Sequence, residues 1–154
     1  AKVGIMGAVA DGVLSAGGKV IGVLPGCLSA KEIAHADLTE LIVVDSMHER
    51  KTIMHEKSDG VIALPGGFGT LEEFFEMLTW AQLGLHAKPI GILNTDGYYD
   101  DLIAMIGKMT AADLLKPEYN GLYLVSDEID DLLHKMENYK APHVKKWIKD
   151  PSAT

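Results

Sequence analysis

Residues 60–73, GVIALPGGFGTLEE, hold the pattern that decides the fold: a short apolar run, a glycine-rich turn and the start of a helix. The apolar run at 60–64 predicts a buried strand, and Pro65-Gly66-Gly67 ends it. Thr70 is expected to begin a helix that continues to about Leu83. A strand that turns tightly into a helix is the first half of a βαβ unit.

The same alternation of helix and strand runs along most of the chain. Further helices are expected at about 4–16, 46–57, 98–109 and 126–136, and further strands at 19–24, 41–44, 89–93 and 122–125. Short strands that alternate with helices form parallel sheets with right-handed crossovers. The sequence therefore predicts an α/β fold: a Rossmann-like, doubly wound parallel sheet with helices on both faces.

The length and composition favour one domain. The chain has 154 residues, of which 47% are hydrophobic and 23% charged, an ordinary globular mixture. We expect one Rossmann-like domain over residues 1–154, with a polar tail from about residue 140. The chain opens on a helix, whereas such a sheet normally opens on a strand. A first strand–helix–strand unit, roughly 30 residues long, is therefore expected to be missing from the numbered chain.

Charge and composition argue against several classes of partner. With 22 acidic and 14 basic residues the formal net charge is −8, so the chain is expected to bind neither nucleic acid nor an anionic membrane. It has no apolar run of the roughly 18 residues that a membrane helix needs, and no signal peptide. The single cysteine, Cys27, is read as a loop residue and allows no intrachain disulfide. A cytoplasmic location is expected.

The glycine-rich turn has a functional and a structural interpretation. Gly66, Gly67 and Gly69 let the backbone approach a ligand closely, and the N–H groups of the following helix form an anion site to which Thr70 adds a hydroxyl. The turn lacks both the P-loop lysine and the GxGxxG spacing of dinucleotide sites. Alternatively, Thr70 and Glu73 have the spacing of a capping box, which would merely start a helix.

Residues 46–51, SMHERK, begin another helix, with a Ser-x-x-Glu spacing that predicts a capping box. Helical spacing places Met47, Arg50 and Met54 on one side, and both methionines are expected to face the sheet. A guanidinium on that face needs a partner, for which Glu73 is the candidate. A structural ion pair, or an arginine that reaches solvent, is the alternative.

Residues 46–51 and 65–73 together resemble the LONELY GUY (LOG) family of cytokinin riboside 5′-monophosphate phosphoribohydrolases, whose members often carry the label lysine decarboxylase. The family pattern PGGxGTxxE matches at every fixed position, and Arg50 stands in the family's second motif. Residues 78–84, LTWAQLG, and 94–99, NTDGYY, are also similar to the family. The resemblance spans about residues 3–125.

The resemblance implies roles for individual residues. It makes Arg50 and Glu73 the catalytic pair. It assigns the 5′-phosphate to the glycine loop. The residues that it places at the phosphate or nucleotide are Gly66, Gly67, Gly69, Thr70, Met47 and Gly7.

The implied activity is hydrolysis of the N-glycosidic bond of AMP or an N6-substituted AMP, giving free base and ribose 5-phosphate, by a homodimer. Neither a metal nor an organic cofactor is expected, and the histidines lack metal-ligand spacing. A general purine or pyrimidine nucleotide nucleosidase and a non-catalytic nucleotide-binding module are the alternatives. Lysine decarboxylation normally needs pyridoxal phosphate on a lysine, and no lysine in the sequence has a convincing setting for it.

Overall fold

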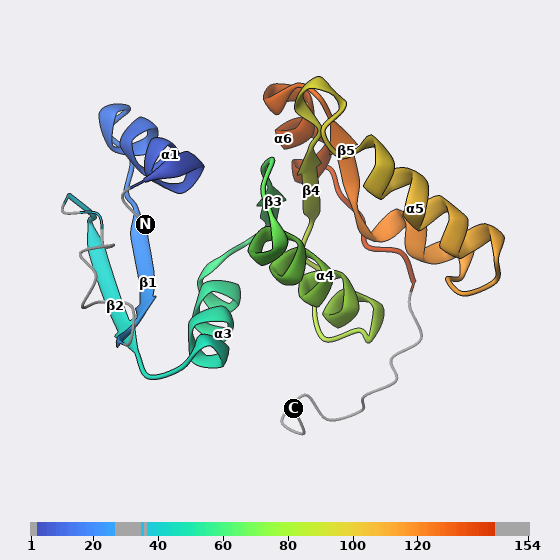
Figure 1. The fold of residues 1–154 in the computed structure, drawn as a ribbon, viewed down its shortest axis with the longest axis horizontal. Helices are drawn as coiled ribbons and strands as arrows, with labels where there is room; N and C mark the ends of the chain where they lie inside the picture. Colours follow the sequence, from blue (N-terminus) through green and yellow to red (C-terminus); the bar gives the residue numbers. More distant parts are fainter. Residues whose placement is uncertain (1–2, 27–34, 36, 144–154) are drawn as a thin grey trace. The chain divides into compact units, whose positions relative to one another are not determined.

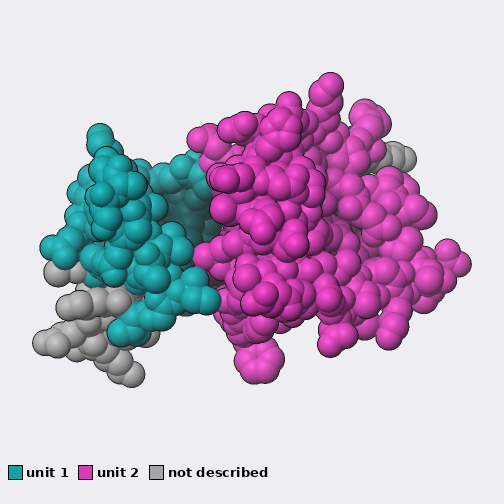
Figure 2. All heavy atoms as spheres, turned by 90° about the horizontal axis from the view of Figure 1, so that it is seen from above, with its two compact units in different colours: residues 1–58 teal, residues 59–154 magenta. Residues whose placement is uncertain are grey.

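The computed structural model describes residues 3–26, 35 and 37–143. They belong to two compact units, Ala1–Ser58 and Asp59–Thr154 (Figure 2). Each unit has its own parallel sheet, of order β1-β2 in the first and β3-β4-β5 in the second (Figure 1). The single domain stays a prediction. Cys27 and the end of the polar tail, residues 144–154, lie outside the described residues.

The described residues of the first unit form α1 (Gly4–Ser15), β1 (Ile21–Pro25), β2 (Glu40–Val44) and α3 (Met47–Lys57). Helix α1 ends as predicted, with Gly17 in the left-handed region at φ +77°. Strands β1 and β2 pair in parallel, with Ile21 opposite Glu40. Strand β1 begins two residues later than predicted, since the N–H of Val20 donates to the Thr39 hydroxyl at 3.0 Å.

Residues 59–143, the described part of the second unit, form three strands, three α-helices and two 3₁₀ helices. These are β3 (Val61–Ala63), α4 (Phe68–Gln82), β4 (Ile90–Leu93), η1 (Thr95–Gly97), α5 (Asp100–Ala111), η2 (Pro117–Leu122), β5 (Leu124–Ser126) and α6 (Ile129–Glu137). Strand β4 is the central strand, and it pairs in parallel with both neighbours. The predicted α/β class and parallel pairing are confirmed.

Both faces of the second sheet carry helices. On one face, Ile90 and Ile92 of β4 are fully buried in a core with apolar residues of α4 and α5. On the other face, a Cβ at Gly91 would lie 3.2 Å from the Leu132 side chain of α6, so this helix packs directly on the strand. Successive strand residues point to opposite faces. The doubly wound arrangement is therefore present within this unit.

Several predicted boundaries in the second unit are wrong. Leu122 belongs to η2 rather than to β5, and Ser126 ends β5 instead of starting α6. Helix α6 begins at Ile129, since the Ser126 hydroxyl accepts the N–H of Glu128 from the end of the strand. Helix α5, expected from Tyr98, starts at Asp100 after η1.

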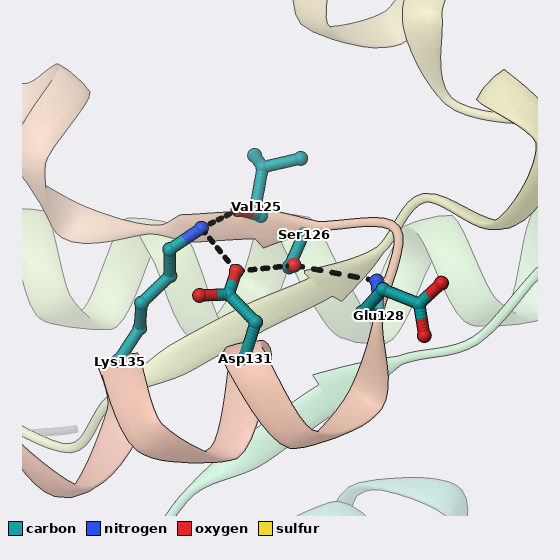
Figure 3. Close-up of polar contacts among 5 residues, drawn as sticks. All are labelled: Val125, Ser126, Glu128, Asp131 and Lys135. Carbon is teal, nitrogen blue, oxygen red and sulfur yellow. Dashed lines mark hydrogen bonds and ion pairs between the residues drawn. The ribbon is translucent and has the colours of Figure 1, made fainter.

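A polar network joins the end of β5 to α6 (Figure 3). The Ser126 hydroxyl donates to Oδ2 of Asp131 at 2.5 Å, and Nζ of Lys135 lies 2.5 Å from the same oxygen. Lys135 also donates to the Val125 carbonyl at 3.0 Å. The hydrogen bond from Lys135, and then that from Ser126, lowers the pKa of Asp131.

This network predicts a loss of stability in acid. The folded-state pKa of Asp131 lies below its unfolded value, so its contribution is fully present above the unfolded pKa and is lost as the pH falls through the folded pKa. Asp131→Asn should therefore be less stable than wild type in urea unfolding near neutral pH, with a gap that closes toward acid. Asp130→Asn, an exposed neighbour on α6, is the control. A gap that stays constant with pH would contradict the prediction.

Candidate functional site

The glycine-rich turn connects β3 directly to α4. The helix begins at Phe68 with Gly67 at its N-cap position, two residues before the predicted start. The N–H of Leu71 makes the first helical bond, to the Gly67 carbonyl at 3.1 Å. Thr70 thus lies inside the first turn, so the interpretation of Thr70 as the cap of a capping box is wrong. Gly67 has no side chain that could cap the first N–H groups of α4, which helix geometry leaves without carbonyl partners.

The glycines of the turn serve different purposes. A Cβ at Gly66 would lie 2.2 Å from the Thr70 hydroxyl oxygen, so packing requires glycine there. At Gly67 and Gly69, a Cβ would have no described atom within 4 Å, and neither residue has a positive φ. Neither packing nor backbone conformation therefore explains these two glycines. Their lack of a side chain keeps the start of α4 open to a ligand.

Glu73 lies on the same helix and on the same face as this opening. It follows Thr70 by three residues, which places the two side chains one above the other on α4. Glu73 is half-buried, whereas its neighbour Glu72 is exposed. The second unit therefore combines a helix N-terminus open to an anion with a carboxylate that lies about 5 Å beyond Thr70 along the helix axis.

The loop after β4 contacts the glycine turn through two tyrosines. Tyr98 donates its hydroxyl hydrogen to the Gly66 carbonyl at 2.9 Å, and Tyr99 donates to the Leu64 carbonyl at 2.6 Å. Burial raises the pKa of Tyr99, which keeps this donor protonated. Sequence reasoning marked residues 94–99 as a loop beyond the end of a strand and by resemblance, but it gave neither tyrosine a role. The available signal was a pair of aromatic hydroxyls directly after an Asp-Gly turn at the end of a strand.

The remaining predicted residues belong to the first unit. Gly7 is buried in α1. Met47 and Met54 are 45% and 38% exposed, so the prediction that both face the sheet is wrong. Arg50 is half-buried, and its Nε donates to the Val23 carbonyl of β1 at 3.3 Å. The pairing of Arg50 with Glu73 of the second unit stays a prediction.

The start of α3 is capped nearly as predicted. The Ser46 hydroxyl accepts the N–H of Glu49 at 3.1 Å, which is one half of a capping box. The Glu49 carboxylate accepts the N–H of Asp45 at 2.9 Å, one residue before the cap. These bonds fix the first turn of α3, which carries Arg50.

Two further features are absent from the described part of the chain, residues 3–26, 35 and 37–143. His, Cys, Asp and Glu side chains form no group of three or more there that could hold a metal ion. No helix in that part is both long enough and apolar enough to span a membrane.

Fold and site together define an α/β protein that presents a glycine-rich helix start and a carboxylate beyond a parallel sheet. A family model described as "Possible lysine decarboxylase" matches residues 6–136. The chain belongs to this family.

Curated relatives match most of the chain. It is 48% identical over 138 residues to the probable cytokinin riboside 5′-monophosphate phosphoribohydrolase LOGL9 of Oryza sativa subsp. japonica, covering 90% of this chain and 61% of the relative. Identity to LOGL1 of the same species is 47% over 142 residues, covering 92% and 64%. For LOG5 of Arabidopsis thaliana it is 46% over 139 residues, covering 90% and 61%. The chain thus spans less than two thirds of the length of these relatives.

The two kinds of glycine predict opposite results when each is changed to alanine. Gly66→Ala should destabilise the protein by about 1–3 kcal/mol, because the new methyl overlaps Thr70. Gly69→Ala should preserve or raise stability by up to about 1 kcal/mol, because alanine favours the helix, while the methyl weakens phosphate binding at the helix start. Urea unfolding and calorimetry with inorganic phosphate measure the two effects. Undiminished phosphate binding by Gly69→Ala would remove Gly69 from the site.

Proposed function

We propose that this chain hydrolyses the N-glycosidic bond of a purine nucleoside 5′-monophosphate. The observation that carries the proposal is the open N-terminus of α4 with Glu73 one turn further along the same face. The names of the relatives describe hydrolases of cytokinin riboside 5′-monophosphates. By that likeness, the substrate is AMP or an AMP that carries a substituent on N6.

The 5′-phosphate binds at the start of α4. Backbone N–H groups and the positive end of the helix dipole attract an anion there. Gly66, Gly67 and Gly69 allow close approach, and Thr70 adds a hydroxyl. An anchored phosphate lets binding energy far from the reacting bond orient the ribose.

The reaction replaces the base by water at C1′ of the ribose. The bond between C1′ and the base nitrogen breaks with its electron pair on the base, and the oxygen of water bonds to C1′. Of the two protons of that water, one stays on the new hydroxyl and the other balances the charge of the departing base. The transition state has oxocarbenium character, which a carboxylate stabilises. We assign this role, and the holding of the ribose hydroxyls, to Glu73.

Arg50 supplies the cation of the site in this proposal, and Met47 and Gly7 contribute to the nucleotide pocket. The bond from Nε of Arg50 to the Val23 carbonyl fixes the plane of the guanidinium. A planar cation held in this way suits the orientation of a carboxylate or a phosphate.

Comparison of four adenine compounds tests the proposal. AMP should lose its base fastest, because its single phosphate fills the short loop. Adenosine lacks the anchor, and ADP and ATP carry phosphates that a loop without a P-loop lysine holds poorly. Chromatography of free adenine from parallel reactions measures this order. Equal cleavage of adenosine and AMP would remove the phosphate role from the loop, and binding of AMP without adenine release would leave a nucleotide-binding module.

Substitution of Glu73 separates catalysis from folding. Glu73→Gln keeps the shape and removes the charge, so kcat for AMP should fall by about two orders of magnitude or more while the unfolding midpoint changes little. Glu72→Gln, an exposed neighbour on α4, is the matched control and should keep its activity. Full activity in Glu73→Gln would reduce Glu73 to a structural residue.

We further propose that the chain forms a homodimer. An apolar groove of about 210 Å³ lies along α4, α5 and η2, and Phe75, Leu78, Ile106 and Met109 are among its lining residues. Apolar surface of this kind is typical of an interface. Sedimentation equilibrium is the test: a species that stays at the monomer mass of 16.6 kDa at high concentration would contradict the dimer.

A further inference from the structure

We propose that Tyr98 is a positioning residue for the phosphate loop: it holds the peptide group between Gly66 and Gly67 so that the Gly67 N–H faces the bound phosphate. This inference rests on the proposed function. The residues on which it is based all belong to the second unit and to the part of the chain that the structure describes.

The planarity of the peptide group carries the argument. The Gly66 carbonyl and the Gly67 N–H belong to one trans peptide, so they point in opposite directions. Tyr98 donates to that carbonyl at 2.9 Å, which directs the N–H to the side away from the tyrosine. The Thr70 side chain lies against the Cα of Gly66, so the peptide is held at a second point.

The hydrogen bond from Tyr98 also makes the Gly67 N–H a stronger hydrogen-bond donor. A carbonyl that accepts a hydrogen bond polarises its own amide, and chains of hydrogen bonds strengthen one another in this way by roughly ten to thirty per cent per bond. The Gly67 N–H is thus both aimed and made a stronger donor to an anion. Burial in the core does not explain the presence of a tyrosine at position 98, because Tyr98 is 56% exposed.

The loop that carries Tyr98 is held in place by its own polar contacts. The Asn94 side chain accepts the N–H of Tyr99 at 2.7 Å and donates to Asp100 at 2.8 Å. Asp96 and Gly97 both have positive φ, +52° and +70°, which turns the chain sharply. A Cβ at Gly97 would lie 2.6 Å from the Asp100 carboxylate, so this turn accepts only glycine there without a shift.

Tyr99 provides an internal comparison. Its ring packs edge-on against that of Tyr98 with centroids 4.9 Å apart, and its hydroxyl binds the Leu64 carbonyl at 2.6 Å. The residue after Leu64 is Pro65, which has no N–H. The same kind of bond, two residues earlier, therefore aims no donor at a ligand. Tyr99 is also only 3% exposed, so its role is in the core.

The experiment compares Tyr98→Phe and Tyr99→Phe with wild type. Calorimetry measures the binding of ribose 5-phosphate and of inorganic phosphate, and steady-state assays with AMP give KM and kcat separately. Tyr98→Phe should weaken ribose 5-phosphate binding and raise KM for AMP about three- to tenfold, the range of one hydrogen bond, with kcat and the unfolding midpoint nearly unchanged. Tyr99→Phe should lower the unfolding midpoint and leave the affinity within about twofold.

A second measurement uses the amide resonance of Gly67 by NMR. Titration of wild type with inorganic phosphate should shift this resonance, and the shift should shrink in Tyr98→Phe. In wild type alone, a Gly67 resonance that stays fixed while phosphate binds would overturn the inference, even if the variant failed to fold.

The outcomes separate the inference from the proposed function. Equal losses of affinity in both variants, or an unchanged affinity in Tyr98→Phe, would overturn the inference while the proposed function stands. Ribose 5-phosphate binding that depends on Tyr98, without base release from AMP, would support the inference and overturn the proposed function. A wild-type chain that binds no phosphate would overturn both.

Discussion

The parallel pairing of β3 with β4 is the constraint on which the rest of the second unit depends. Val61 lies opposite Ile90, so both strands run in one direction and end at the same edge of the sheet. The loop that follows β3 is the glycine turn, and the loop that follows β4 carries the two tyrosines. An antiparallel pairing would send these loops to opposite edges. Parallel order is thus what lets Tyr98 reach Gly66, although they are 32 residues apart.

Under the proposed function, this arrangement accounts for the binding of a phosphate by an acidic chain. With a net charge of −8, the long-range field of the protein repels an anion, so the attraction must come from groups in direct contact. Backbone N–H groups at a helix start supply it without adding a charged side chain. Their cost is structural: the turn must stay free of side chains at Gly67 and Gly69, and the helix gives up a capping side chain. Because Tyr98, on another loop, holds the glycine turn, the turn can do without side chains at these two glycines and the helix without a capping side chain.

Sequence reasoning predicted the elements better than their ends. The apolar runs at 41–44 and 89–93 located β2 and β4. Strand β4 is buried at three of its four residues, whereas Leu41 and Val43 of β2 are exposed, so a continuous apolar run located a strand in both settings. The start of α4 was placed too late because Thr70 has good capping chemistry, yet Gly67 takes the cap position. Ser126 was assigned to a cap for the same reason, although it binds Glu128 from the end of a strand. In both cases local side-chain chemistry fitted two registers. At Ser126, pairing with Leu93 of β4 keeps the residue in the strand.

The sequence predicted only those parts of the candidate site that lie within one contiguous motif. The PGGxGTxxE pattern located the loop and Glu73, because those residues are contiguous. Tyr98 could not be assigned a role in the same way, since its partner is a carbonyl on a different loop and no side-chain pattern records it. The methionines of α3 were misplaced for a related reason: helical spacing gives a shared side but not the surface that this side faces.

The chemistry of the second unit also bears on two reactions: the decarboxylation in the description of the family, and the hydrolysis in the names of the relatives. A phosphate cradle alone does not separate them, because pyridoxal phosphate and a nucleoside monophosphate both present a phosphate. The group beside the cradle does: a Schiff base needs a lysine amine there, whereas an oxocarbenium-like sugar needs a carboxylate. On α4, the side chain one turn beyond the cradle is Glu73. Lys135, which reaches the end of β5, has its ammonium engaged by the Asp131 carboxylate and the Val125 carbonyl. The position of the carboxylate therefore favours cleavage of a ribosyl bond over decarboxylation.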